Sequence, residues 1–283
     1  MHRILIFNLG GTSTKLAVFD EETLVVEGTI RHTDREIQGC TDNAEQIAFR
    51  RGAIEAWLLE NHISLDDLSA VVIRSSGAGL CKKGGTYLVT GKLRDGMYAA
   101  YRGSFPKAPH PSFIVLPLAD EILGSRPIPI YIVDPDGVDE FQDVAYITGH
   151  PDLPRSSGFH VLNHKAIARK ASRDLGKRYE DADLVVAHMG GGISIAAHRH
   201  GMVVDSTSGG SAGEGPFGTN RTGPLPLNKL VDRCFSGAYT KSEIMDLIMT
   251  QGGFLAHTGC TDLRIIEQKA LLSGEKSVQN EGS

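Results

Sequence analysis

One glycine-rich hairpin occurs twice in the chain. Residues 6–17 and 186–197 each read as an apolar strand, a polar residue, a turn rich in glycine and a returning strand. The polar residue is Asn8 in the first copy and His188 in the second, 180 positions later with no gap in the alignment. Tight turns of glycine, serine and threonine between strands can point several backbone N–H groups at one anion. The repeat therefore predicts two similar halves that hold one polyphosphate from opposite sides, and two plain hairpins without a ligand are the alternative.

The composition is that of an ordinary globular protein. The 283 residues suffice for one large or two average domains with a substantial core. A net charge of −5 gives no reason to expect nucleic acid or a membrane surface as a partner. No apolar run approaches the roughly 20 residues that span a bilayer, and no signal peptide is evident, so we expect a cytoplasmic protein. The four cysteines are scattered, which indicates neither a zinc site nor a disulfide framework.

The order of predicted elements divides the chain into two domains, residues 1–150 and 151–283. Apolar patterning in the first domain predicts strands at 3–8, 14–19, 24–31, 70–73 and 128–133, and helices over 42–62 and 112–123. The second domain begins to repeat this order, with a basic helix over 160–175, a hairpin from 184, a strand over 202–205, and helices over 225–235 and 241–252. The polar segment 274–283 has little to bury and is expected to be disordered.

Several short motifs follow one another in a fixed order. They are Asn-Leu-Gly-Gly-Thr-Ser-Thr-Lys at 8–15, Gly-Phe-His at 158–160, His-Met-Gly-Gly-Gly at 188–192, Gly-Glu-Gly-Pro-Phe at 213–217 and Asn-Arg-Thr-Gly at 220–223. In this combination the chain resembles the acetate and butyrate kinase family, and butyrate kinases are the closer match. The resemblance implies an α/β, duplicated actin-like (ribonuclease H-like) fold of two domains with a nucleotide between them.

The resemblance also implies the chemistry. Such enzymes transfer a phosphoryl group reversibly between ATP and a short-chain carboxylate, which gives an acyl phosphate and ADP. They require Mg²⁺ and are commonly homodimers or larger homo-oligomers. Family members continue beyond the last residue of this chain, so we expect an incomplete second domain that stops before the adenosine-binding segment. A truncated, inactive or weakly active relative that binds phosphate or nucleotide, or that serves as a partner protein, is therefore an alternative. A sugar or glycerol kinase of the same superfold is another.

Phosphoryl transfer needs positioned donors and neutralised charge more than covalent chemistry from the protein. The two glycine loops would supply backbone N–H groups and hydroxyls to the phosphates of ATP or ADP. The candidate nucleotide-binding residues are Asn8, Gly10, Gly11, Thr12, Ser13, Thr14, Lys15, His188, Gly190, Gly191, Gly192 and Glu214. For Glu214 a turn-stabilising role is an equal alternative, because glycines surround it.

Two arginines and one histidine are the candidate catalytic residues at the transferred group. Arg74 ends a buried strand, where side chains of α/β sheets reach a ligand crevice, and Arg221 lies in a loop of glycine, proline and threonine. By the resemblance both flank the transferred group, and surface ion pairs are the alternative. His160 matches the family's transition-state-stabilising histidine. We expect it to donate a hydrogen bond, because an ionised carboxylate needs no general base. His164, one turn later, is expected to be structural.

The metal and substrate sites have weaker signals. Mg²⁺ prefers one or two carboxylates together with phosphates and waters. Asp134, at a strand end, is the best carboxylate for that metal and for catalysis, with Asn8 orienting the metal or its water. By the resemblance, His110 matches a substrate-pocket position. The chain departs from the family after its first arginine, where it reads Ser-Ser-Gly at 75–77. The resemblance therefore does not determine the shape of the acyl pocket.

Overall fold

The computed structural model describes residues 1–40, 42–103, 111–207 and 213–280, without the side chains of residues 34, 38 and 273–280. The chain forms two compact units, Met1–Val138 and Asp139–Ser283, called unit 1 and unit 2 below. They divide at Val138, N-terminal to the boundary that the sequence suggested at residue 150. Within the described ranges, no helix is both long and apolar enough to cross a membrane.

Unit 1 is built on a mixed sheet with the strand order β3-β2-β1-β4-β6-β5. Its strands are β1 (Arg3–Leu9), β2 (Ser13–Asp20), β3 (Thr23–Arg31), β4 (Ala70–Ile73), β5 (Thr86–Leu88) and β6 (Ile130–Val133). The first three form an antiparallel meander, whereas β4 runs parallel to β1, and β6 runs parallel to β4. The ends of β1, β4 and β6 therefore meet at one edge of the sheet. The antiparallel edge strand β5 was not predicted.

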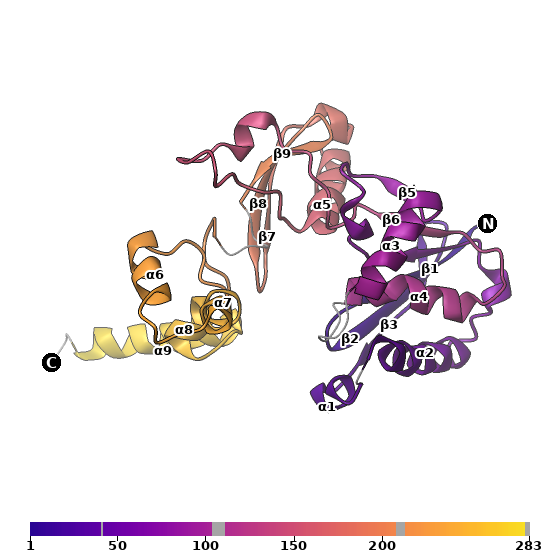
Figure 1. The fold of residues 1–283 in the computed structure, drawn as a ribbon, viewed down its shortest axis with the longest axis horizontal. Coiled ribbons are helices and arrows are strands. Elements are labelled where there is room, and N and C mark those ends of the chain that lie inside the picture. The colour runs from indigo at the N-terminus through magenta and orange to yellow at the C-terminus, as the bar shows by residue number, and fades with distance from the viewer. Residues whose placement is uncertain (41, 104–110, 208–212, 281–283) are drawn as a thin grey trace. The chain divides into compact units, whose positions relative to one another are not determined.

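Helices bury the apolar residues of this sheet. The long helices α2 (Asn43–Glu60) and α4 (Pro111–Leu123) pack against each other, and α4 contacts β1 and β4 (Figure 1). Helix α4 is buried along nearly its whole length and continues through Pro117, which the sequence marked as unfavourable for a straight helix. Helix α3 (Gly91–Gly103), which the sequence analysis missed, packs on α4. The short helix α1 (Asp34–Gln38) begins with a capping box at Thr33.

Unit 2 contains a second antiparallel meander with the order β7-β8-β9. Its strands are β7 (Leu184–Met189), β8 (Ile193–Arg199) and β9 (Met202–Ser206), and helix α5 (Val161–Asp174) packs against β7. The later helices are α6 (Leu227–Cys234), α7 (Lys241–Met249), α8 (Gly253–Thr258) and α9 (Leu263–Asn280). Helix α9 extends through residues 274–280, where the sequence analysis expected disorder.

The two glycine-rich hairpins differ by one residue. Asn8 pairs across the hairpin with Lys15, seven positions later, whereas His188 pairs with Ser194, six positions later. The second turn is therefore one residue shorter, and the gapless alignment is wrong on the returning strand. Since a one-residue shift exchanges the two faces of a strand, Ser194 takes the cross-strand position of Lys15 and not that of Thr14.

Candidate active site

Three predicted residues of unit 1 lie at one edge of its sheet. Asn8 is near the end of β1, Arg74 follows β4, and Asp134 follows β6. The Arg74 backbone N–H donates to the carbonyl oxygen of Phe7 at 2.9 Å, which fixes Arg74 beside the end of β1. Polar side chains at the carboxyl ends of neighbouring parallel strands are the usual arrangement of a ligand site in an α/β sheet.

The side chains of Arg74 and Asp134 differ in exposure and in how firmly they are held. The half-exposed Arg74 guanidinium forms an ion pair with Asp136 at 3.4 Å. Asp134 is 1% exposed and has a φ of +42°, a backbone conformation that costs a non-glycine residue about 1–3 kcal/mol. Its Oδ1 accepts the Gly85 N–H at 2.8 Å, and its own N–H donates to the Gly85 carbonyl at 2.9 Å. The backbone at Gly85 thus holds the Asp134 carboxylate in place.

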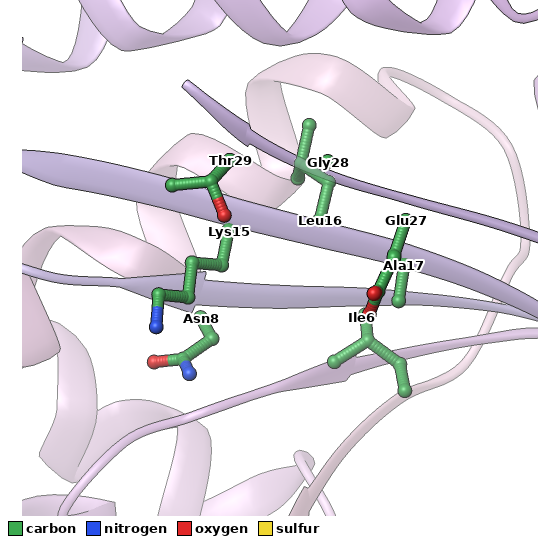
Figure 2. A pocket seen from close by; sticks show the side chains of 8 residues that line it. All are labelled: Ile6, Asn8, Lys15, Leu16, Ala17, Glu27, Gly28 and Thr29. Atoms are coloured by element: carbon green, nitrogen blue, oxygen red, sulfur yellow. The ribbon is translucent and has the colours of Figure 1, made fainter. Parts of the chain in front are cut away.

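A hollow of about 560 Å³ opens beside the first hairpin. Figure 2 shows the side chains of Asn8 and Lys15 extending into it from the adjacent strands β1 and β2, in agreement with their cross-strand pairing. Glu27 and Thr29 line it from β3. An amide and an ammonium group together can bind phosphate or carboxylate oxygens, so two of the predicted nucleotide-binding residues share one surface.

The first glycine loop is held from behind by Arg50, which the sequence analysis missed. The fully buried guanidinium of Arg50, on α2, donates to the carbonyl oxygens of Gly10 and Gly11 at 2.9 Å and of Ser13 at 3.1 Å. It also donates to the Thr14 hydroxyl at 2.9 Å, and that hydroxyl contacts His32 Nε2 at the same distance.

These contacts orient the loop. The carbonyl groups of Gly10 and Gly11 point toward Arg50. The Thr14 hydroxyl also bonds to Arg50, so it points into the interior of unit 1 and not into the hollow. Burial lowers the pKa of Arg50 to about 10, so the guanidinium stays protonated at neutral pH. Arg50 could have been found from the sequence, because Ile47, Arg50 and Ile54 share the helical spacing of one buried face.

Two predicted residues of unit 2 lie together at the start of α5. His160 is the residue before the first turn of that helix, and its ring stacks on the ring of His188 with centroids 3.8 Å apart and planes 13° apart. The Nδ1 atom of His160 lies 2.8 Å from the Ser194 hydroxyl. His188 Nδ1 lies 3.1 Å from the side-chain oxygen of Asn163.

His164 is fully buried behind this pair, as expected for a structural residue. Its Nε2 lies 2.8 Å from the Ser194 hydroxyl, and its Nδ1 lies 3.5 Å from Nε2 of the buried His198. Burial is the main cause that lowers the pKa of both His164 and His198 to about 4, with smaller contributions from neighbouring positive groups. Both rings are therefore neutral at pH 7.

These lowered pKa values predict a loss of stability in acid. The unfolded chain protonates both histidines near pH 6.5, whereas the folded chain does so only near pH 4. Their contribution to stability is therefore complete above pH 6.5 and is lost as the pH falls toward 4. Between pH 7 and pH 5 we expect a decrease of about 2 kcal/mol per histidine in the free energy of unfolding. Hydrogen exchange of the β8 amides, corrected for intrinsic rates, measures this free energy. A free energy of unfolding that does not change between pH 7 and pH 5 would contradict the lowered pKa values.

Arg221 lies in a loop that packs on the second glycine turn. The Gly218 N–H donates to the Arg221 carbonyl at 3.0 Å, and a Cβ at Gly218 would collide with the Gly191 carbonyl oxygen. The loop is fixed from its other side by the Thr222 N–H, which donates to the Ile248 carbonyl at 3.1 Å. The missing side chain at Gly218 thus permits the close approach that brings the Arg221 loop beside Gly191.

Glu214, which the sequence suggested as a nucleotide-binding residue, forms an ion pair within unit 2. Its carboxylate pairs with Arg155 at 2.8 Å, and Arg155 also contacts Asp205 at 3.0 Å and the Ser206 carbonyl at 2.6 Å. These contacts favour the turn-stabilising alternative for Glu214. His110, the predicted substrate residue, lies outside the described residues. In the described part of the chain, no three His, Cys, Asp or Glu side chains form a cluster that could hold a metal ion.

Comparisons with known proteins show the family of the chain. The family described as "Acetokinase family" matches residues 150–280. The chain is 39% identical over 280 residues to a "Probable butyrate kinase" of Clostridium botulinum, a match that covers 98% of this chain and 76% of the relative. "Butyrate kinase 1" of Clostridium acetobutylicum is 39% identical over 278 residues, with the same coverage.

Solved structures give the fold. Acetate kinase of Porphyromonas gingivalis superposes with a TM-score of 0.74 at 18% identity and covers 99% of this chain and 75% of its own. A propionate kinase of Francisella tularensis gives a TM-score of 0.70, also at 18% identity, over 96% of this chain and 74% of its own. The predicted actin-like α/β fold is confirmed.

Proposed function

The chain belongs to the acetokinase family, and we propose that it transfers the γ-phosphoryl group of ATP reversibly to a short-chain carboxylate. Butyrate is the first candidate acceptor, because the relatives at 39% identity bear the name butyrate kinase. One methylene in an apolar pocket changes binding by only about 1–3 kcal/mol, so neighbouring acids are expected to react as well. The observation that carries the proposal is the pair of glycine-rich hairpins, one in each unit.

In the proposed reaction a carboxylate oxygen attacks the γ-phosphorus, and the bond from that phosphorus to the β,γ-bridging oxygen breaks. The products are an acyl phosphate and ADP, and no proton has to be removed from the acceptor. The glycine loops would bind the phosphates through backbone N–H groups, and Lys15, Arg74 and Arg221 would neutralise their charge. His160 would donate a hydrogen bond to an oxygen of the transferred group, whose interaction with the donor strengthens in the transition state.

Asn8 and Asp134 fit a Mg²⁺ site of the kind that phosphates and waters complete. Both offer oxygen donors, at the ends of strands separated only by β4. Gly85 fixes the Asp134 carboxylate, which spares the metal the cost of ordering that ligand. When bound, Mg²⁺ would neutralise the polyphosphate. The homo-oligomer expected from the resemblance stays a prediction, which sedimentation equilibrium tests.

The substitution Asp134→Asn isolates the charge of this carboxylate, because the amide oxygen can still accept the Gly85 N–H. We expect the Mg²⁺ concentration for half-maximal activity to rise at least about tenfold with little change in stability, since a carboxylate binds Mg²⁺ better than a neutral amide. A Mg²⁺ titration at saturating ATP measures the effect. Asp95→Asn, at an exposed position on α3, is the matched control. An unaltered Mg²⁺ dependence in Asp134→Asn would remove Asp134 from the metal site.

The proposed activity is tested by trapping the acyl phosphate with hydroxylamine. ATP, Mg²⁺ and butyrate should give butyryl hydroxamate and ADP in equal amounts, and omission of butyrate or addition of a chelator should abolish both. Acetate, propionate and isobutyrate, assayed in parallel, rank the acceptors. A folded protein that forms no hydroxamate from any of these acids would refute the proposal.

A further inference from the structure

A chain of polar side chains runs from the interior of unit 2 to His160. The Tyr179 hydroxyl lies 2.7 Å from His198 Nδ1, and His198 Nε2 lies 3.5 Å from His164 Nδ1. His164 Nε2 lies 2.8 Å from the Ser194 hydroxyl, which lies 2.8 Å from His160 Nδ1. Ser194 and His198 come from β8, and the other two histidines come from the start of α5.

The interior members of this chain are shielded from water. His164 and Ser194 are fully buried, His198 is 2% exposed and Tyr179 is 7% exposed. Burial keeps the two interior imidazoles neutral at pH 7. A neutral imidazole carries one N–H and one bare nitrogen, so a ring bonded at both nitrogens donates through one and accepts through the other. The tautomer of each ring, meaning which of its nitrogens carries the proton, is thereby coupled to the tautomer of the next ring.

The Ser194 hydroxyl couples the tautomer of His164 to the tautomer of His160. It has one proton and two lone pairs, and it also accepts the backbone N–H of His160 at 3.4 Å. With one lone pair so used, the hydroxyl donates to one imidazole and accepts from the other. The tautomers of His160 and His164 are therefore not independent.

Tyr179 selects the direction. A phenol O–H is more acidic than a neutral imidazole N–H and is therefore the better hydrogen-bond donor, and an imidazole nitrogen is a better acceptor than a phenol oxygen. The hydroxyl therefore donates to His198 Nδ1, which leaves the proton of His198 on Nε2. His198 Nε2–H then donates to His164 Nδ1, His164 Nε2–H donates to Ser194, and Ser194 donates to His160 Nδ1.

We propose that Tyr179, His198, His164 and Ser194 form a directed hydrogen-bond chain that holds His160 as its Nε2–H tautomer. His160 then presents a proton on the ring nitrogen opposite Ser194, as a donor to the transferred phosphoryl group requires. This role rests on the proposed function of His160. Ser194 and His164 are positioning residues, because they act through His160.

The wild-type protein gives the first test, which needs no activity. Nitrogen-15 chemical shifts of the histidine rings distinguish the two tautomers. We expect Nε2–H in His160, His164 and His198 at pH 7. An Nδ1–H tautomer of His160, or rapid exchange between both forms, would overturn the proposal, even if the protein proves to be an active carboxylate kinase. Conversely, fixed Nε2–H tautomers in a protein without kinase activity would support the hydrogen-bond chain and refute the proposed function.

Two variants test the coupling. Ser194→Ala should leave His160 as a mixture of tautomers and lower kcat about tenfold while changing the KM for ATP less than twofold, because one oriented hydrogen bond is lost. Ser172→Ala is the matched control, since Ser172 is a fully buried serine of α5 whose hydroxyl bonds the Ala168 carbonyl. Tyr179→Phe removes the far donor, and the His198 ring should then become a tautomeric mixture. If His160 keeps one tautomer in Ser194→Ala, or His198 does in Tyr179→Phe, the proposal is wrong.

Discussion

Replacement of His160 by alanine is expected to lower kcat for acyl phosphate formation by about 10²–10³-fold, the usual loss when one transition-state donor is removed. The KM for ATP should change little, since the phosphates keep their contacts with the glycine loops. His160→Gln is expected to retain more activity than His160→Ala, because the amide nitrogen of glutamine can reach the position of Nε2. Steady-state rates with butyrate and ATP measure both effects.

His150 provides the control for this prediction. It is an exposed histidine of the same unit, and His150→Ala should keep wild-type kinetics. The stacking of His160 on His188 makes a second readout necessary, because a truncated His160 could let the His188 ring move. The His188 ring resonances report such a movement. Full activity of His160→Ala would show that the phosphoryl group is stabilised by other residues.

Replacement of Arg50 by methionine is expected to destabilise unit 1 and to weaken ATP binding. Methionine keeps much of the side-chain length but leaves the carbonyls of Gly10, Gly11 and Ser13 without their donor. Buried groups that lose a charged partner cost several kcal/mol, so we expect unit 1 to lose roughly 3–5 kcal/mol of stability. The KM for ATP should rise at least about tenfold, because the loop that would bind phosphate loses its fixed backbone.

The chain offers a close control for Arg50. The next residue, Arg51, lies on the exposed side of α2 and pairs with Glu55 at 2.7 Å and with Glu121 at 3.7 Å. Exposed ion pairs contribute about 0–1 kcal/mol, so Arg51→Met should destabilise the protein far less than Arg50→Met. Trp57, the single tryptophan, lies on the same helix and reports the unfolding of unit 1 by fluorescence. Equal stabilities of Arg50→Met and Arg51→Met would show that Arg50 does not support the loop.

The sequence predicted the parts of the fold that depend on local pattern. Alternating apolar residues located both hairpins, and strand ends located Arg74 and Asp134, because period and strand direction determine where such side chains lie. The turn length was missed, since residue types align without a gap while cross-strand pairing depends on how many residues form the turn.

Side chains that join distant segments were harder to predict. Arg50 contacts a loop about 40 positions earlier in the chain, and Arg155 reaches Glu214, 59 positions later. No periodicity connects such residues, although Arg50 carried a signal as a charged residue on an apolar helix face. The link from His160 through Ser194 to His164 joins a helix to a strand, and it depends on packing that the sequence alone does not reveal.

Phosphorus-31 NMR of the wild-type protein with ATP, Mg²⁺ and butyrate distinguishes phosphorylation of the carboxylate from hydrolysis of ATP. We expect the γ-phosphate signal of ATP to decay while an acyl phosphate signal and the two ADP signals grow at the same rate. We also expect ADP added with synthetic butyryl phosphate to regenerate ATP. Release of inorganic phosphate as the first product, or an ATP spectrum unaltered by the folded protein, would contradict the proposed function.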